Sequence, residues 1–273
     1  MPGVAIDDDD RPIGRILSRR EVLSLLGGTA LIAACAPTAL SAPAASAAAA
    51  ASSSAAAAAA KTSVGIGSGV VVLPSCVVRP ALTEGPYFVD EKLNRSDIRS
   101  DPSTNAVKPG VPLGLTFFVS KVSGTSCAPL PSATVDLWHC DALGIYSDAT
   151  DPTFGSTKGT QFLRGYQSTD ANGKAAFTTI WPGWYQGRAV HVHFKIRATA
   201  ANGQVSDFTS QLFFDETLND QILALSPYSQ KGASGRLRNT GDGIFQQSGG
   251  KLTIAPTKSG DGYIATFDIG LAA

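Results

Sequence analysis

From residue 64 onward the chain consists largely of short segments in which apolar and polar residues alternate, separated by turns rich in glycine, asparagine and aspartate. Successive side chains of a strand point to opposite faces, so this alternation predicts strands that bury one face. The expected strands are Leu113–Val119, Ala133–Trp138, Lys174–Ile180, Ala189–Arg197, Asp207–Phe214 and Tyr263–Ile269. One helical segment, roughly Asn219–Leu225, stands between them. Because strands do not alternate with long helices, the pattern argues against a Rossmann fold or a TIM barrel. It predicts an all-β fold, a β-sandwich of mixed strands with one short helix.

The first 35 residues have the features of an export signal. Ser18–Leu23 resembles a twin-arginine motif, and the apolar run Val22–Ala34 that follows is too short to span a bilayer as a stable helix. A chance arginine pair in front of an ordinary secretory signal is the alternative. We therefore expect an exported protein, in which residues 1–35 precede the part that folds.

A lipid anchor is the second expectation for this region. Ile32–Cys35 matches the bacterial lipobox, so a lipidated Cys35 would hold the protein at the membrane, whereas cleavage near Ala47 would release it. Residues 36–63 are rich in alanine and serine, cannot build a core and suit a tether. The predicted organisation is thus a signal at 1–35, a tether at 36–63 and a folded domain at 64–273.

Charge and cysteine content narrow the possible partners. The 22 basic residues balance the 22 acidic ones, so no basic surface for nucleic acid is expected. The signal aside, three cysteines remain in an oxidising compartment: Cys76, Cys127 and Cys140. One disulfide and one free thiol is the simplest arrangement, with Cys127 bonded either to Cys140 or to Cys76.

Two histidines share one face of the strand expected at Ala189–Arg197. His191 and His193 are two residues apart, so their side chains project together while the neighbouring apolar residues face the core. Paired imidazoles on a rigid strand are suitable metal ligands, although His-x-His alone is equally typical of an ordinary buried pair. A three-histidine zinc site would have to include His139, the only other histidine.

Two tyrosines lie where turns can bring them back to these histidines. Tyr185 follows a Pro-Gly turn shortly before His191, and Tyr146 ends a segment in which a strand gives way to a glycine turn. Each tyrosine alone would be read as an ordinary half-buried aromatic residue. Together with the histidine pair they form a candidate metal site.

Several motifs together resemble those of the intradiol ring-cleavage dioxygenases, which include the catechol and protocatechuate dioxygenases, and more closely their secreted single-domain relatives. The similarity extends from about Cys76 to Asn239. The motifs that carry it are Thr83–Tyr87, Arg95–Ile98, Gly110–Leu113, Trp138–Ala142 with Gly144 and Tyr146, and Tyr185–His193. Each motif is weak alone, and the combination is specific.

This resemblance implies a non-haem Fe(III) enzyme. The iron would be held by Tyr146, Tyr185, His191 and His193. A bound cation deprotonates a tyrosine ligand, and two hard anionic oxygens favour ferric iron. The partners would be O2 and a small aromatic diol of the catechol type. The ring would be cleaved between its hydroxylated carbons to a cis,cis-muconate-type product.

The same resemblance implies roles for further residues. Tyr185 would leave the iron and accept a proton from the substrate. Arg188 matches the active-site arginine of the family, which would stabilise negative charge on the activated ring, although a surface ion pair is its ordinary alternative. Gln211 matches a glutamine near the substrate. Tyr87 would line the pocket, unless it has a core or interface role.

Two other functions are compatible with the sequence. An exported β-sandwich could bind ligands without iron, and a zinc-dependent hydrolase could use the histidine pair with a carboxylate such as Asp136 or Asp141. The segment between Tyr185 and His191 is shorter than in the protocatechuate enzymes, and no helical dimerisation domain like that of the catechol enzymes is expected. The sequence therefore assigns neither a ring substituent nor an oligomeric state.

Overall fold

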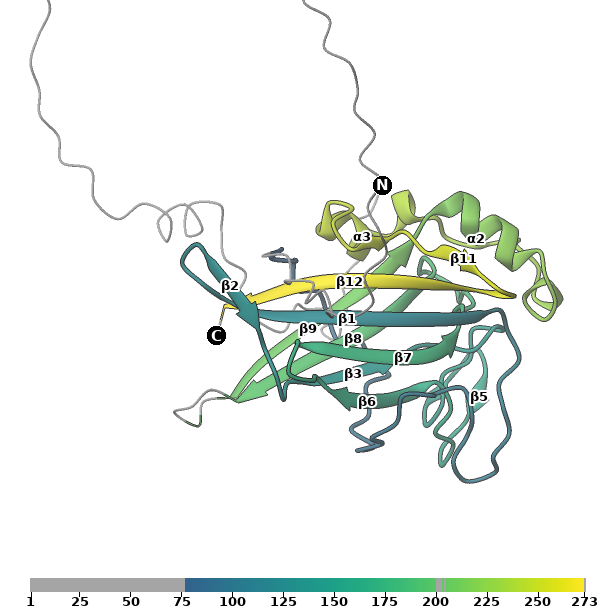
Figure 1. Ribbon diagram of the computed structural model, residues 1–273. Coiled ribbons are helices and arrows are strands. Elements are labelled where there is room, and N and C mark those ends of the chain that lie inside the picture. The colour runs from purple at the N-terminus through teal and green to yellow at the C-terminus, as the bar shows by residue number, and fades with distance from the viewer. Residues whose placement is uncertain (1–76, 200–202, 204, 273) are drawn as a thin grey trace, which may run out of the picture. The chain divides into compact units, whose positions relative to one another are not determined.

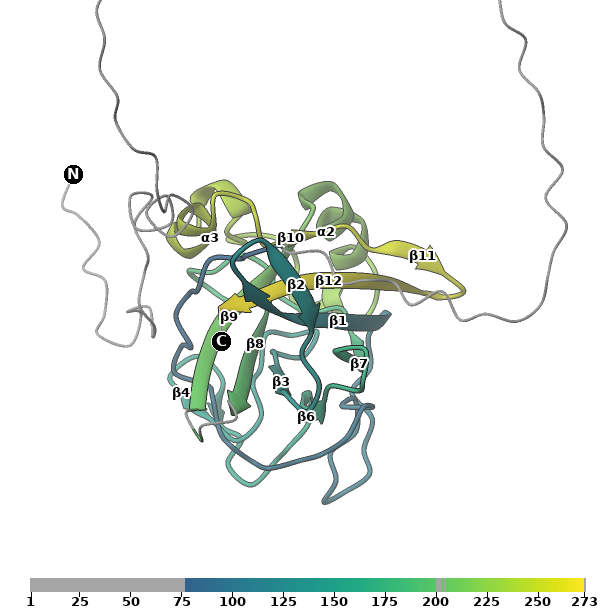
Figure 2. The same ribbon diagram turned by 60° about the vertical axis from the view of Figure 1, so that its left-hand side comes forward.

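The alternating segments form two five-stranded sheets in the computed structural model, which describes residues 77–199, 203 and 205–272 (Figures 1 and 2). The first sheet contains β1 (Pro112–Ser123), β2 (Ser126–Pro129), β7 (Lys174–Ile180), β11 (Thr257–Ser259) and β12 (Gly262–Ala272). The second contains β3 (Thr134–Trp138), β6 (Arg164–Ser168), β8 (His191–Thr199), β9 (Val205–Phe214) and β10 (Thr253–Ile254). The predicted signal, the tether, Cys35 and Cys76 lie outside the described residues.

The sheets contain both parallel and antiparallel pairs. In the first sheet, of order β11-β12-β1-β2, β1 is parallel to β12 from Leu113↔Tyr263 to Val122↔Ala272 and antiparallel to β2 and β7. In the second sheet, of order β10-β9-β8-β3-β6, β8 lies between β3 and β9 and is antiparallel to both. The prediction of mixed strands is confirmed.

The hydrophobic core lies between the two sheets. Alternate residues of β1 are buried, and the ring of Phe117 lies 5.3 Å from that of Phe194 on β8, measured between centroids. Phe194 also lies 5.4 Å from Phe267 on β12. Because each sheet buries the apolar side of its strands against the other, the fold is the predicted β-sandwich.

All six predicted strands are present, and the predicted helix begins earlier than expected. The helix α2 spans Glu216–Leu223, because the carboxylate of Asp215 accepts hydrogen bonds from the Thr217 and Leu218 amides and so fixes the start. A second short helix, α3 (Gly243–Ser248), was not predicted, since it is too short to show a helical period. Figures 1 and 2 show α2 and α3 on the same side of the sandwich. None of the helices in the described residues is long and apolar enough to cross a membrane.

Of the two pairings that the sequence left open for Cys127, the bond to Cys140 is not formed, and Cys76 lies outside the described residues. Cys127 and Cys140 are both free thiols. Cys127 lies on β2 in the first sheet, where its Sγ contacts Ser120 Oγ at 3.2 Å. Cys140 follows β3 in the second sheet and is buried, with its Sγ 3.6 Å from Gly183 O. The two cysteines therefore belong to different layers of the sandwich.

Candidate metal centre

The two histidines are buried at the start of β8, the middle strand of the second sheet. His191 and His193 are only 2% and 1% exposed, and their Nε2 atoms lie 3.0 Å apart. In the sheet His193 is flanked by Trp138 on β3 and Gln211 on β9. The alternation of the strand turns both imidazoles to one face, as the sequence predicts.

Two loops bring the tyrosines to this pair. Tyr146 lies in the loop that follows β3, and Tyr185 lies in the loop between β7 and β8. Their hydroxyl oxygens are 3.4 Å and 3.3 Å, respectively, from Nε2 of His191. Together with His191 and His193 they form a cluster of four side chains, in which the other three polar atoms surround His191 Nε2.

The two tyrosine loops are in contact backbone to backbone. Gly183 donates its amide to Asp141 O at 3.1 Å, and a Cβ at Gly183 would lie 2.5 Å from both Asp141 O and Ala142 O. Gly144, at a φ of 85°, approaches the other loop equally closely, since a Cβ there would lie 2.3 Å from Trp184 O. Only glycine fits at both positions, and the relative position of the tyrosines depends on this approach.

A lysine ties the same loops together from a third segment. The ammonium of Lys231 donates to Leu143 O at 2.8 Å and to Trp184 O at 2.9 Å. It also lies 4.7 Å from the centre of the Trp184 ring, within cation–π range. Lys231 therefore joins the loop of Tyr146 to the loop of Tyr185.

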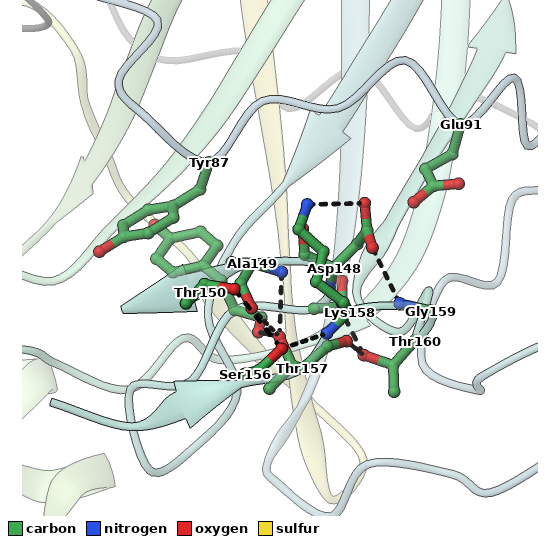
Figure 3. Close-up of polar contacts among 12 residues, drawn as sticks. Tyr87, Glu91, Asp148, Ala149, Thr150, Ser156, Thr157, Lys158, Gly159 and Thr160 are labelled. Atoms are coloured by element: carbon green, nitrogen blue, oxygen red, sulfur yellow. Dashed lines mark hydrogen bonds and ion pairs between the residues drawn. The ribbon is translucent and has the colours of Figure 1, made fainter. Parts of the chain in front are cut away.

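A small hairpin supports the backbone of Tyr146. Strands β4 (Thr150–Asp151) and β5 (Gly155–Ser156) form it, and Thr157 donates its hydroxyl to Tyr146 O at 2.7 Å. The amide of Thr157 donates to Ala149 O at 2.8 Å, while Asp148 accepts the Gly159 amide at 2.9 Å (Figure 3). These contacts fix the chain immediately after the tyrosine.

Tyr87 lies beside this hairpin (Figure 3), and its ring packs against that of Tyr146. The two rings are stacked, with centroids 4.3 Å apart and planes 19° from parallel, and Tyr87 also meets the ring of Tyr185 edge-on at 6.2 Å. Its hydroxyl donates to the carboxylate of Asp151 on β4. The structure thus brings Tyr87 against the tyrosine pair.

Arg188 and Gln211 are hydrogen-bonded to each other next to the cluster. Arg188 Nη2 donates to Gln211 Oε1 at 2.5 Å, and Arg188 Nε donates to the buried carboxylate of Asp242 at 3.0 Å. Gln211 is fully buried and donates to Thr83 O at 3.1 Å. All seven predicted site residues therefore lie in one contiguous region.

The electrostatics of the cluster follow from its burial. Burial lowers the pKa of both His191 and His193 well below the usual value, raises the pKa of Tyr185 to about 12 and raises the pKa of Tyr146 well above its usual value. His191 Nδ1 lies 2.6 Å from Ala189 O, a group that only accepts, so Nδ1 carries the proton. The lone pair of His191 Nε2 then faces the three other polar atoms.

This donor set fits a single metal ion. Two ligands about 2.0–2.1 Å from one metal lie roughly 3 Å apart when their bonds meet near a right angle. The distances from His191 Nε2 to the other three atoms, 3.0, 3.3 and 3.4 Å, match that spacing. Phenol oxygens with neutral imidazoles suit a hard, highly charged cation, which would also lower the raised pKa values of both tyrosines.

The groups that a zinc hydrolase would require are engaged elsewhere. Asp136 and Asp141 each form a salt bridge with a basic side chain at 2.9 Å. Both ring nitrogens of His139 are hydrogen-bonded, to Cys140 O at 2.7 Å and to Thr179 Oγ1 at 2.6 Å. Across the part of the chain that the structure describes, no group of three or more His, Cys, Asp or Glu residues could hold a metal. A metal site at the histidine pair thus depends on the tyrosines.

A cavity of about 610 Å³ opens beside Tyr185. Its wall is formed by both tyrosine loops, the tip of the β4–β5 hairpin and the segment around Lys231. Trp184, Phe154 and Ile145 contribute apolar surface to it, whereas Gln186 and Lys231 contribute polar groups. A mostly apolar cavity with a few polar groups is typical of a small-molecule site.

Comparisons with known proteins agree with this geometry. The model of a family described as "Dioxygenase" matches residues 83–237, which is more than half of the chain. An intradiol ring-cleavage dioxygenase of known structure from Tetranychus urticae is 34% identical, with a TM-score of 0.61 over 72% of this chain and 94% of that one. The chain belongs to the intradiol ring-cleavage dioxygenase family.

Other relatives within the intradiol dioxygenase family are more distant. The protocatechuate 3,4-dioxygenase beta chain of Burkholderia cepacia is 29% identical over 53% of this chain and 62% of its own length. Catechol 1,2-dioxygenase 2 of Acinetobacter lwoffii is 30% identical over 44% of this chain and 46% of its own. This chain therefore spans less than two thirds of the curated relatives that it matches. The dioxygenase domain of a carbohydrate-binding fusion protein from Streptomyces sp. SirexAA-E is 28% identical, with a TM-score of 0.50 over 72% of this chain and 99% of that domain.

Two residues around the site of this intradiol dioxygenase were not predicted from sequence. Lys231 lies far from both loops along the chain, and no pattern marks a lysine that binds carbonyl groups. Asp242, which contacts Arg188, precedes α3 in a Thr-Gly-Asp-Gly segment. An aspartate before a helix is a recognisable cap signal, but the helix is too short to have been expected.

Proposed function

We propose that this protein is a non-haem Fe(III) dioxygenase that cleaves catechol-type rings between their two hydroxylated carbons with O2. The observation that carries the proposal is the buried cluster of two tyrosine oxygens and two histidine nitrogens beside a cavity. Family membership supports it, since the relatives are ring-cleavage dioxygenases. The expected product is a cis,cis-muconate-type diacid.

Four side chains would hold the iron: Tyr146, Tyr185, His191 and His193. When bound, ferric iron would supply the Lewis acidity and the electron-accepting capacity that make a catechol ring reactive toward O2. His191 is oriented for this task by its Nδ1 contact with Ala189 O, which leaves Nε2 unprotonated. The stacked ring of Tyr87 limits the movement of Tyr146.

Tyr185 is the ligand that would also handle a proton. It lines the cavity, whereas Tyr146 is fully enclosed at 1% exposure. A catechol that enters the cavity therefore approaches Tyr185 first. Its Oη would accept a proton from a substrate hydroxyl, because burial raises the pKa of the Tyr185 phenol to about 12 and so favours its protonated form.

Arg188 would stabilise the negative charge that the ring acquires during reaction. Its guanidinium is largely buried and held by Gln211 and Asp242, so little reorganisation is needed when charge develops. The apolar wall formed by Trp184 and Phe154 would exclude water from the ring. A cavity of about 610 Å³ is large for a single six-membered ring, so substituted catechols are expected to fit.

The first test is the visible spectrum of the purified protein with and without catechol under air-free conditions. Tyrosinate-bound ferric iron gives a red-brown band, which should move to longer wavelength with catechol, and admission of air should consume one O2 per ring. Tyr185→Phe should alter the band, whereas Tyr166→Phe, on β6 and outside the cluster, should leave it unchanged. A protein that stays colourless after Fe(III) loading would instead favour a binding module that lacks iron chemistry.

A further inference from the structure

One buried carboxylate connects Arg188 to the helix α3. Asp242 is 1% exposed, and its Oδ2 accepts hydrogen bonds from Arg188 Nε at 3.0 Å and from the Ala189 amide at 2.7 Å. Its Oδ1 accepts from the amides of Ile244 at 2.8 Å and Phe245 at 3.1 Å, which caps α3. The two oxygens thus serve two different parts of the molecule.

The contact fixes the orientation of the guanidinium. Arg188 is held at Nε by Asp242 and at Nη2 by Gln211 Oε1, 2.5 Å away. These two bonds hold the plane of the group from two sides. Among the described residues Nη1 has no hydrogen-bond partner, so this nitrogen is free to meet an oxygen of the substrate.

We propose that Asp242 is a positioning residue for ring cleavage, acting through Arg188. The proposal rests on the function proposed above. Because Oδ2 also accepts from the Ala189 amide, it fixes the backbone directly after Arg188 as well as the side chain.

The alternative is that Asp242 serves only as the cap of α3, and substitutions can separate the two roles. Serine retains a cap acceptor and removes the bond to Arg188. Asparagine can cap with its oxygen, but its amide would then point two donor hydrogens at the donors of Arg188 and Ala189. The matched control is Asp215→Ser, because Asp215 caps α2 in the same way and, in the part of the chain that the structure describes, forms no hydrogen bond or ion pair with Arg188.

The deciding experiment is a double-mutant cycle on the iron-loaded enzyme with catechol. Asp242→Ser is expected to lower kcat about 10- to 100-fold, as is typical of residues that orient an active-site group, with KM changed less than about 3-fold. Arg188→Gln should lower kcat at least as much. The double variant should then be no slower than Arg188→Gln alone, because the carboxylate acts through the arginine. Asp215→Ser should leave kcat unchanged.

Two outcomes would overturn the proposal. If the losses in kcat of Asp242→Ser and Arg188→Gln multiply, Asp242 acts independently of Arg188. If Asp242→Ser retains the wild-type kcat, its carboxylate is a helix cap only. Asp242→Asn should be at least as slow as Asp242→Ser, and recovery of wild-type kcat in that variant would also contradict the role.

A readout that does not depend on turnover separates this proposal from the proposed function. The Arg188 Nε proton, observed by ¹H–¹⁵N NMR, should exchange with solvent slowly in the wild type and at least about tenfold faster in Asp242→Ser, because a hydrogen bond to a buried carboxylate is lost. Equal exchange rates would refute the positioning role in any case. If the Arg188 Nε proton exchanges slowly but the wild type does not cleave catechol, the proposed function is refuted. Asp242 would then still orient Arg188, but not for ring cleavage.

Discussion

Replacing Gly183 by alanine is expected to push the two tyrosine loops apart. The added Cβ would lie 2.5 Å from Asp141 O and from Ala142 O. Both are backbone atoms, so no side chain can rotate away, and an ordinary contact of 3.4 Å requires about 0.9 Å of loop movement. The φ of Gly183 lies outside the left-handed region, so the effect is steric.

The magnitude follows from this overlap. Overpacking against a rigid backbone costs about 1–3 kcal/mol of unfolding free energy. For a domain of this size that corresponds to a melting temperature lowered by roughly 2–12 °C. Since Tyr185 follows Gly183 closely, the same displacement moves its hydroxyl away from His191 Nε2, now 3.3 Å distant, and should weaken iron binding.

The melting temperature is measured by calorimetry of the metal-free protein. Iron binding is measured by titration followed by visible absorption. Gly243→Ala is the matched control, because a Cβ there meets no atom within 4 Å and its φ is ordinary. The reasoning is refuted if Gly183→Ala melts within about 1 °C of the wild type and binds iron equally well.

Three further predictions concern residues around the site. Lys231→Met removes two hydrogen bonds between the loops and should lower the unfolding free energy by about 1 kcal/mol while altering the iron band, whereas an unchanged spectrum would contradict the bridging role. Burial lowers the pKa of His139 from 6.5 to about 4, so the unfolded chain takes up a proton before the folded one does, and the wild type loses stability as the pH falls from 6.5 to 4. The difference in unfolding free energy between the wild type and His139→Gln should therefore shrink by about 3 kcal/mol between pH 7 and pH 4 in urea titrations. A difference that stays constant over this range would exclude the effect. Burial raises the pKa of the Cys140 thiol, so iodoacetamide at pH 8 should label Cys127 and spare Cys140 in peptide mass spectrometry; equal labelling would show that Cys140 is accessible.

Strands with a regular alternation of apolar and polar residues could be predicted from the sequence, whereas features that depend on contacts between distant residues could not. Lys174–Ile180 was predicted with the bounds that β7 has, because its alternation reflects a half-buried strand. The strands of two to five residues that were not predicted are β2, β4, β5, β6, β10 and β11, which are too short for a clear alternation. The cysteine pairing stayed open at the level of sequence, because cysteine spacing carries no information on which sheet each residue joins.

The candidate site shows the same division. Strand periodicity alone brings His191 and His193 to one face. The approach of Tyr146 and Tyr185 depends on glycines that permit contact between two loops. The turns beside both tyrosines indicated this approach, and the family resemblance made it specific. Asp242 contacts Arg188 across many residues of sequence, and only the folded chain reveals it.

The parallel pairing of β1 with β12 has a consequence for how the protein folds. Most of the described chain lies between these two strands, so closing their ladder costs much chain entropy before any contact is gained, and folding should be slow. Until β12 is synthesised, one side of β1 is an unpaired edge, which other chains can join. Nascent or shortened chains that lack β12 should therefore aggregate, and the sandwich should assemble in one late step rather than progressively from the ribosome.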